Sequence, residues 1–461
     1  MNTQSVFRQR LWRWHFFAGL LVCPFAILLA VTGSLYLFKP QIDDYVENTI
    51  NAKASAIDVS SVPLSYDQLL SGLLEKHPQA QFKQLVLAKE NDQSIEIELI
   101  QGNGQVEIFW LDQYSGTVLD RAFSDERFLA IVKDFHAELL LGNGGSYTVE
   151  LMASWMIILI LTGLYLWLDV SGSRESFKKK WRRWLIPQLK SARARINYKS
   201  LHAVIGVWFT LPILVLLFSG LPWTQLWGSG FKMIQEHMGW RDASQQWSSS
   251  VISQANQRQR ATTTDVSLWQ ISSPDHTHSN DTTTAHTHKL WDMRAIEIIV
   301  QQLKQENLVP PIQINPPNTA NQNWIVRTMS QQRSERVTIH YDNLTAQEVM
   351  RTEFADHHIV QRFISQGISL HEGVLFGWLN QLLGLLTAIA IIALSCFGLV
   401  TWWRRRPRGE LAPPPEVRTP ITSPIIYLII FMGILLPAAG ISFAAVVLGK
   451  YAYARFRQRH N

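Results

Sequence analysis

The sequence predicts a membrane protein: an α-helical bundle of four spans from two parallel repeats, a fifth span, and two small α+β domains outside the membrane. Three observations predict this fold class. The 461 residues are 47% hydrophobic, only 17% charged and include 18 tryptophans, which is more apolar and aromatic than a typical soluble chain. Long uncharged apolar runs recur along the chain, and its two halves share one spacing of histidine and glycine.

Five uncharged apolar runs have about the 20 residues that are needed to cross a bilayer. They are residues 16–38, 151–168, 203–227, 374–403 and 425–448. The first run has no small-residue cleavage site before Lys39, so we interpret it as an anchor and not as a removable signal peptide. Cys23 and Cys396 fall inside runs, and we interpret both as packing residues.

The charges beside these runs predict the orientation, because Lys and Arg stay on the cytoplasmic side. Residues 169–199 carry ten Lys/Arg against two acids, residues 404–423 begin RRRPR, and the N-terminus carries three arginines. Residues 39–150 carry eighteen Asp/Glu and eight Lys/Arg, as expected of an exported domain. The net charge of +6 therefore reports topology, and gives no support for a nucleic-acid partner. Five spans would place the basic tail KYAYARFRQRH outside, against the same rule.

An internal repeat relates four of the runs. His15 and His202 each have a glycine four residues later and another 18 residues later, namely Gly19, Gly206, Gly33 and Gly220. His136 and His371 are the second residues of FHAELLLGNGG and LHEGVLFGWLN. Each is followed by a glycine at +6 (Gly142, Gly377), a glycine at +27 (Gly163, Gly398) and a tryptophan at +31 (Trp167, Trp402). Two copies of one hairpin that enter from the same side predict a repeat axis along the membrane normal.

The two exported segments also repeat. Residues 63–121 predict a helix, the alternating strands FKQLVLA, SIEIELI and QVEIFWLD, and a turn at YSG. Residues 292–351 predict a helix in MRAIEIIVQQLKQEN and the strands NWIVRTM and RVTIHYD. Each copy therefore predicts one small α+β domain. The resulting division of the chain is 1–39, 40–134, 135–169, 170–199, 200–227, 228–368 with an insertion at 275–288, 369–404, 405–423 and 424–461.

The motif set resembles the PepSY-associated transmembrane family, whose inner-membrane members include iron-regulated proteins and di-haem ferrisiderophore reductases. The resemblance covers residues 8–408. It lies in the H-x-x-x-G helix starts, in FHAELLLG and LHEGVLFG, in the span ends TGLYLW and FGLVTWWRR, and in the D-x-Y-S-G-x-V-L ending of the first exported domain, where the second copy has Ala346 instead of glycine. It implies a bacterial inner-membrane location, a cytoplasmic N-terminus, PepSY-like periplasmic domains and an iron chelate as substrate.

The four repeated histidines should form two pairs. A rise of about 1.5 Å per residue places His15 and His202 near the cytoplasmic edge, whereas His136 and His371 lie toward the outer edge, with a helix break at GNGG, residues 142–145. The repeat axis should therefore pair His15 with His202, and His136 with His371. Two neutral imidazoles that face each other suit the axial positions of a b-type haem, so we predict two bis-histidine haem b sites.

The glycine four residues after each inner histidine, Gly19 or Gly206, should let a flat macrocycle or the partner backbone come close. For any single ring, the alternative is an interfacial histidine that bonds a headgroup or a carbonyl. The clusters WRW, WRRW and TWW are interpreted as interface belts, and a haem contact from Trp12 or Trp403 would be secondary.

A polar stretch at residues 275–289, DHTHSNDTTTAHTHK, offers four weaker candidate metal ligands: His276, His278, His286 and His288. A disordered insertion is the favoured interpretation of this stretch. No G-x-G-x-x-G follows a strand and there is no Walker sequence, so electrons should come from quinol or a membrane protein. The first four runs contain no Asp, Glu, Lys or Arg, which argues against an ion-coupled transporter.

We therefore expect an oxidoreductase that passes single electrons outward to a ferric siderophore or another iron chelate, with membrane lipid around it and no nucleic acid. Two alternatives stay open. A non-enzymatic PepSY binding or regulatory module would hold no haem, and its histidines would be replaceable. A metal-handling membrane protein would depend on the histidine-rich stretch instead.

Overall fold

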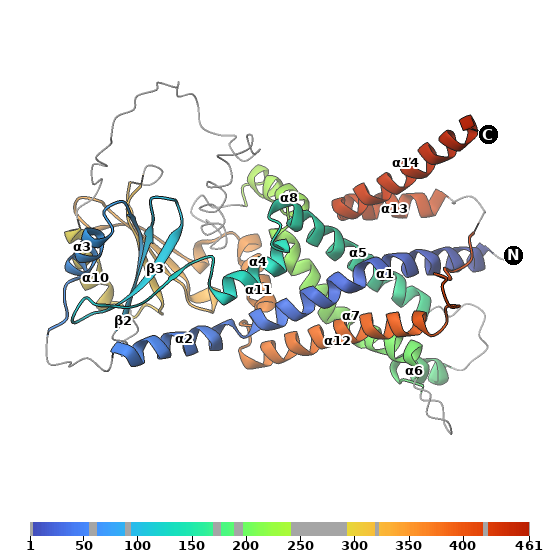
Figure 1. The fold of residues 1–461 in the computed structure, drawn as a ribbon, viewed down its shortest axis with the longest axis horizontal. Coiled ribbons are helices and arrows are strands. Elements are labelled where there is room, and N and C mark those ends of the chain that lie inside the picture. The colour runs from blue at the N-terminus through green and yellow to red at the C-terminus, as the bar shows by residue number, and fades with distance from the viewer. Residues whose placement is uncertain are drawn as a thin grey trace. The chain divides into compact units, whose positions relative to one another are not determined.

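The chain forms two compact units in a computed structural model that describes residues 3–54, 62–87, 94–168, 177–188, 197–240, 293–318, 322–417 and 423–460 (Figure 1). The first unit, called the helical unit below, comprises residues 1–39, 131–239 and 366–461. The second, called the sheet unit, comprises residues 40–130 and 240–365.

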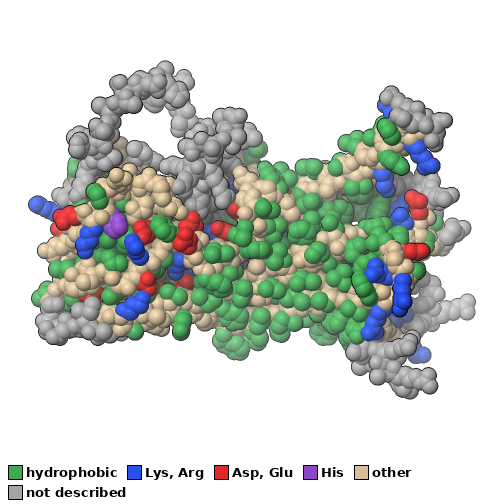
Figure 2. All heavy atoms as spheres, in the orientation of Figure 1, with side chains coloured by type: hydrophobic (Ala, Val, Ile, Leu, Met, Phe, Trp, Pro, Cys, Tyr) green, Lys and Arg blue, Asp and Glu red, His purple; other side chains and the backbone are tan. Residues whose placement is uncertain are grey.

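Four helices of the helical unit are long and apolar enough to cross a membrane. They are α1 (Thr3–Leu37), α5 (Asn143–Leu168), α7 (Tyr198–Gly220) and α12 (Trp378–Trp403). Helix α1 packs against α5 and α12, and α7 packs against the same two helices, so each of the four has two neighbours among the other three. Their outward surface is covered with apolar side chains (Figure 2), as a bilayer requires. The protein is therefore a multi-pass membrane protein.

Short helices precede two of the spans. Helix α4 (Phe128–Glu138) ends four residues before Gly142, and α11 (Ile359–His371) ends six residues before Gly377. Gly142 and Gly377 both have a φ of 59°, a left-handed conformation that suits glycine where a helix must end and the chain turn. A break after His136 is confirmed, but it lies at residues 139–142, and the rest of the GNGG stretch begins α5.

The predicted fifth span is wrong. Residues 425–448 form parts of two helices, α13 (Ser423–Leu435) and α14 (Pro437–His460). Pro437 has no backbone N–H and its ring obstructs a continuous helix, so α13 ends just before it. The two helices pack against each other, and a β-carbon on Gly440 would lie 2.8 Å from Cα of Gly433. The described chain thus contains four candidate spans and a short apolar hairpin.

The predicted boundaries of the other spans also change, most clearly those of the second and third. The third run holds α7, a 3₁₀ turn η1 (Leu221–Trp223) and the start of α8 (Leu226–His237). Helix α5 begins eight residues before the second run and so contains Glu150, which contradicts the expectation of charge-free spans. Its carboxylate is fully buried and accepts hydrogen bonds from the backbone N–H groups of Leu226 (2.8 Å) and Trp227 (3.0 Å). It therefore caps the start of α8, where the helix dipole favours an anion.

The sheet unit contains one antiparallel sheet of eight strands in the order β4-β3-β2-β1-β5-β6-β7-β8. The first half contributes β1 (Gln81–Leu87), β2 (Ser94–Ile100), β3 (Val106–Asp112) and β4 (Val118–Phe123). The second contributes β5 (Ile312–Asn315), β6 (Trp324–Thr328), β7 (Val337–Tyr341) and β8 (Glu348–Glu353). The five predicted strands are present, and β4, β5 and β8 add to them.

The expectation of two separate α+β domains is corrected by this sheet. Strands β1 and β5 pair directly, with Leu85 opposite Ile314, so the two halves share one sheet. Helices α3 (Tyr66–Lys76) and α10 (Arg294–Lys304) also contribute to a single core with both sets of strands. Burial of apolar surface from both halves in one core stabilises them as a unit.

The opposite face of the first half is covered by α2 (Lys39–Ala54), which packs Ile50 against Ile108 and Trp110. Lys53 of α2 also pairs with Asp120 of β4 at 2.5 Å.

Candidate functional site

The four predicted histidines form two close pairs in the helical unit. The ring centres of His15 and His202 lie 6.4 Å apart, and those of His136 and His371 also lie 6.4 Å apart. His15 is on α1 and His202 on α7, whereas His136 and His371 end α4 and α11. The structure therefore pairs His15 with His202 and His136 with His371, as predicted.

In three of the four histidines, Nδ1 lies within hydrogen-bond distance of a hydroxyl group. His15 Nδ1 is 2.9 Å from Thr162 Oγ1, His136 Nδ1 is 3.0 Å from Thr32 Oγ1, and His371 Nδ1 is 3.0 Å from Ser219 Oγ. The fourth ring, His202, lies with Nδ1 2.8 Å from the carbonyl oxygen of Leu394.

These partners fix the tautomer of each ring. Each of the three hydroxyls already donates its proton to a backbone carbonyl of its own helix: Thr32 to Leu28 and Leu29, Thr162 to Leu159, Ser219 to Leu216. With the hydroxyl proton placed in this way, the hydroxyl oxygen accepts from the imidazole, and a carbonyl oxygen always accepts. All four neutral rings consequently carry their proton on Nδ1 and keep the lone pair of Nε2 for another partner, as metal-binding histidines do.

A glycine of a neighbouring span makes room for each ring. A β-carbon on Gly33 would lie 3.0 Å from Cε1 of His136, and one on Gly163 would lie 3.1 Å from Cε1 of His15. The same distance would be 3.4 Å from Gly220 to His371 and from Gly398 to His202. These are the glycines that the repeat places at +18 and +27, and they let each imidazole lie against a helix backbone.

The glycines at +4 have a different environment. A β-carbon on Gly19 would meet only Leu159 Cδ2 at 3.8 Å, and one on Gly206 only Leu394 Cδ2 at 3.6 Å. Both are ordinary contacts with side chains, so the close approach of a partner backbone expected at these glycines is not found.

The hydroxyl partners were missed by sequence reasoning, although the sequence carries a signal for them. Thr32, Thr162 and Ser219 each directly precede a glycine that receives a histidine. The fourth glycine, Gly398, follows Phe397 instead. The ring at this glycine, His202, hydrogen-bonds to the backbone carbonyl of Leu394.

Burial also keeps the His136 ring neutral. Desolvation, and then the neighbouring His371, lower the pKa of His136 to about 4, so its Nε2 lone pair is available near pH 7. The Trp223 ring stands edge-on to His371, with 5.9 Å between ring centres, and fills the space beside this imidazole.

His276, His278, His286 and His288 lie outside the described residues. Within the described ranges, no cluster of three or more His, Cys, Asp or Glu could hold a metal ion. Trp12 and Trp403 expose 48% and 63% of their surface, as expected of side chains that face lipid, and Arg406 lies 3.8 Å over the ring of Trp403.

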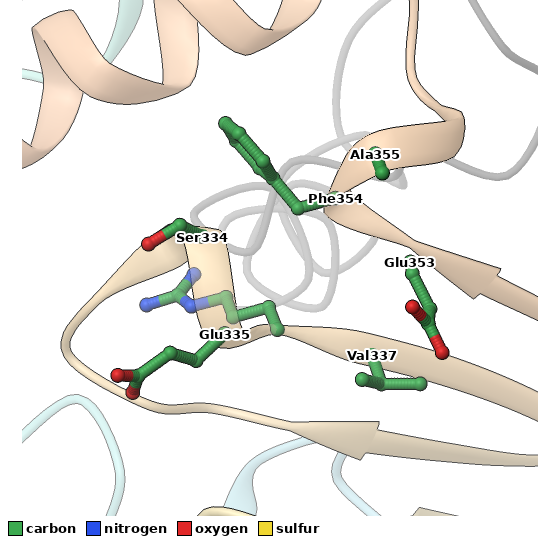
Figure 3. A pocket seen from close by; sticks show the side chains of 7 residues that line it. Ser334, Glu335, Val337, Glu353, Phe354 and Ala355 are labelled. Atoms are coloured by element: carbon green, nitrogen blue, oxygen red, sulfur yellow. The ribbon is translucent and has the colours of Figure 1, made fainter.

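The sheet unit has a shallow pocket of about 300 Å³ between the start of β7 and the end of β8 (Figure 3). It is lined by Ser334, Glu335, Arg336, Val337, Glu353, Phe354 and Ala355. The Arg336 guanidinium donates to the carbonyl oxygen of Ser330 (2.8 Å), and the pocket volume is at the lower limit of small-molecule sites. Its size and mixed charge do not identify a ligand.

Comparison with known families agrees with the resemblance. The chain matches the model of the PepSY-associated TM region over residues 12–405, and it belongs to this family. The matched range contains both histidine pairs and their four glycines. No curated protein matches the chain.

Proposed function

We propose that this protein is a haem-containing reductase of the bacterial inner membrane, which passes electrons across the membrane to a periplasmic ferric chelate such as a ferric siderophore. One observation carries the proposal: two histidine pairs with the same ring spacing and the same free nitrogen, Nε2, in every ring. Each electron delivered would convert one Fe(III) to Fe(II), which chelates of this kind hold less tightly.

The spacing of the rings fits an axial pair of ligands. A bond from an imidazole nitrogen to a metal is about 2 Å long, and Nε2 lies roughly 1 Å from the ring centre. Two such ligands on opposite sides of one iron therefore put their ring centres about 6 Å apart. Both pairs have 6.4 Å. The donor set also fits, because bis-imidazole ligation is one of the ways in which proteins hold b-type haem for electron transfer.

Haem b, when bound, would supply a one-electron couple at each pair. The chain's own residues would set its position: His15 with His202 at one level, and His136 with His371 at the other. Thr162, Thr32, Ser219 and the carbonyl of Leu394 would orient the rings, and the four glycines would allow them to lie against the helices. The apolar spans around the pairs would exclude water, which helps to set the potential.

The proposed topology follows from charge and from the repeat. The basic ends of the spans would face the cytoplasm, with the two halves related by an axis along the membrane normal. His15 and His202 would then lie near the cytoplasmic side, close to a quinol or protein donor. His136 and His371 would lie near the periplasmic side, where the sheet unit would receive the chelate.

The test is an absorbance spectrum of the purified protein in detergent, oxidised and reduced with dithionite. It compares the wild type with His15→Ala, His371→Ala and the exposed control His237→Ala. We expect a low-spin b-type spectrum with two haems in the wild type and the control, and the loss of a different haem in each of the other two variants. A colourless wild type from haem-replete cells would overturn the proposal in favour of a non-enzymatic binding module.

A further inference from the structure

Three cations lie near the His15–His202 pair, on the side of the basic helix ends. Lys199 is three residues before His202 on α7, and Arg8 is seven residues before His15 on α1. Residues that are three or seven apart lie on the same face of a helix. Arg405 is seven residues after Gly398, the glycine that receives the His202 ring. Lys199 and Arg8 therefore lie one or two turns beyond the histidine pair, on the faces that carry it, and Arg405 follows the end of α12 by two residues.

Contacts of these residues and their neighbours bring the basic ends of the helices together. Arg8 Nη2 donates to the carbonyl oxygen of Leu166 at 3.5 Å, one turn past the glycine that receives His15. The Arg404 guanidinium lies 4.6 Å from the ring centre of Tyr198, so the end of α12 meets the start of α7. Lys199 is close enough to Arg405 and Arg8 to be repelled by the charge of both.

In the part of the chain that the structure describes, two of these charges have no protein counter-ion. Among the described residues, neither the Lys199 ammonium nor the Arg405 guanidinium has a hydrogen bond or an ion pair with another side chain. Like charges that converge repel one another unless an anion lies between them. The preference of Lys and Arg for one side of the membrane accounts for the sign of the charge. It does not account for convergence on the faces that carry the two histidines.

We infer that Lys199, Arg8 and Arg405 form a binding site for the carboxylates of the group that His15 and His202 hold. The inference rests on the proposed function, because haem b carries two propionate carboxylates. Ammonium and guanidinium groups form short, charge-assisted hydrogen bonds to carboxylates. The site sets the orientation of the group, with its carboxylates toward the basic helix ends and its apolar edge toward the middle of the spans.

The cations also affect the potential at this pair. A positive charge near the iron favours the reduced state, which carries one positive charge fewer. Removal of the cations leaves the carboxylates uncompensated, which favours the oxidised state. The effect falls with distance, so it is confined to the pair near Lys199.

The experiment is a redox titration of the full-length protein in neutral detergent, followed by absorbance. It compares the wild type, the double variant Lys199→Gln/Arg405→Gln, the charge-retaining Lys199→Arg/Arg405→Lys, and the exposed control Arg408→Gln. In Lys199→Gln/Arg405→Gln, we expect a lower midpoint potential and a lower content of one haem only, the one that His15→Ala removes. The charge-retaining variant and the control should match the wild type. The second haem, bound to the same molecule, reports whether the variants are folded.

The inference is overturned if the neutral double variant keeps both midpoint potentials and the full haem content, or if both haems shift equally. It is also overturned if the shift appears only in vesicles that contain phosphatidylglycerol, because the cations would then serve a lipid phosphate. A colourless wild type is a separate outcome that removes both this inference and the proposed function.

Discussion

Gly33 lies so close to His136 that a β-carbon on this glycine would stand 3.0 Å from Cε1 of the imidazole. Such a contact is tighter than nine in ten of those that real β-carbons make, so the ring would have to shift by a few tenths of an ångström. His136 is held by packing and by its bond to Thr32. The relationship recurs at the other three rings with distances from 3.1 to 3.4 Å.

We expect Gly33→Ala to displace the His136 ring and to perturb or remove one of the two haems. Overpacking of this kind costs about 1–3 kcal/mol. Gly163→Ala should act in the same way on the His15 haem, and Gly220→Ala and Gly398→Ala should have smaller effects because their contacts are longer. Haem content and reduced spectra measure the effect. Gly230→Ala in α8, where a β-carbon would meet nothing within 4 Å, is the control. Equal spectra for Gly33→Ala and this control would contradict the prediction.

Thr32 and His136 give a second prediction. Thr32→Val keeps the shape of the side chain and removes the acceptor for the Nδ1 proton of His136. Without this bond the imidazole is a weaker electron donor, so the midpoint potential of its haem should rise and haem retention should fall about tenfold. Ser219→Ala should act in the same way on the His371 haem. A backbone carbonyl also lies beside each ring, that of Leu29 at His136 and that of Leu216 at His371, and limits both effects.

The control for this prediction is Thr148→Val on α5, whose hydroxyl bonds only the carbonyl of Gly144. A redox titration of the three variants decides the matter. If Thr32→Val leaves both potentials at the wild-type values, the hydroxyl does not orient the ring.

The sequence identified the histidines and the glycines, but not which of them meet. Spacing along a helix shows which residues share a face, and His15 shares a face with Gly19 on that basis. It does not show which residue of another helix faces them, so the contact of His15 with Gly163 became visible only in three dimensions. A Thr or Ser directly before each of three glycines is visible in the sequence. Its role as a hydrogen-bond partner is not, because that role depends on a histidine ring from a different helix.

The fold was predictable to a similar extent. Period-two patterns revealed the long strands, but β5 has only four residues, too few to show alternation. The pairing of β1 with β5 joins segments more than 200 residues apart, and no local pattern records it. Hydropathy predicted the fifth run as one span because it averages over Pro437 and does not detect the reversal there.

Glu96 on β2 gives a pH prediction. Burial, and then the charge of Glu98, raise the pKa of Glu96 to about 7, against the opposing effects of Arg127 and the hydrogen bond from Trp110. The folded protein thus holds this proton more tightly than the unfolded chain, whose carboxyl titrates near 4.5. The free energy of unfolding therefore falls as pH rises from about 4.5 to about 7.

Glu96→Gln should stabilise the sheet unit at pH 8 by about 1–3 kcal/mol and leave it unchanged at pH 4.5, since one pKa unit corresponds to about 1.4 kcal/mol. Hydrogen exchange of β2 and β3 amides in the full-length protein, compared with the wild type at each pH, measures this difference. Glu75→Gln on the exposed face of α3 is the control. A variant that is equally stabilised at both pH values would show that ionisation is not the cause.

Two matching turns give another prediction. Asp112 and Asp342 each accept hydrogen bonds from the backbone two and three residues on, and the chain then reaches Gly116 (φ 67°) or Ala346 (φ 52°). Gly116→Ala should destabilise the sheet unit by about 1–2 kcal/mol, because a left-handed conformation disfavours a β-carbon and this one would meet Leu64 at 3.3 Å.

Ala346→Gly should change stability by less than Gly116→Ala does, since relief of the left-handed strain is offset by the loss of a buried methyl group worth about 0.8 kcal/mol. Hydrogen exchange of β3, β4, β7 and β8 amides measures both substitutions in one experiment. A larger loss in Ala346→Gly than in Gly116→Ala would contradict this account of the two turns.

The α13–α14 hairpin predicts the location of the C-terminal tail. Helix α13 has 13 residues, about 20 Å, which is less than the roughly 30 Å of a bilayer core. The chain reverses at Pro437, and the close approach of Gly440 to Gly433 sets the two helices side by side (Figure 1). The basic end of α14, which includes Lys450, Arg455 and Arg457, therefore returns to the side on which α13 begins. This removes the conflict between a fifth span and the positive-inside rule.

Single cysteines in a background without Cys23 and Cys396 test this location. We expect Arg457→Cys and Arg408→Cys to be protected from a membrane-impermeant thiol reagent in intact spheroplasts and labelled after permeabilisation. Lys76→Cys in the sheet unit should be labelled in intact spheroplasts. If Arg457→Cys is labelled there while Arg408→Cys is protected, the hairpin opens to cross the bilayer. The protection of both would mean that the apolar faces of α13 and α14 enter the membrane from one side only, beside α5. Trp155 of α5 donates a hydrogen bond from its indole N–H to the hydroxyl of Ser442 on α14 (3.0 Å).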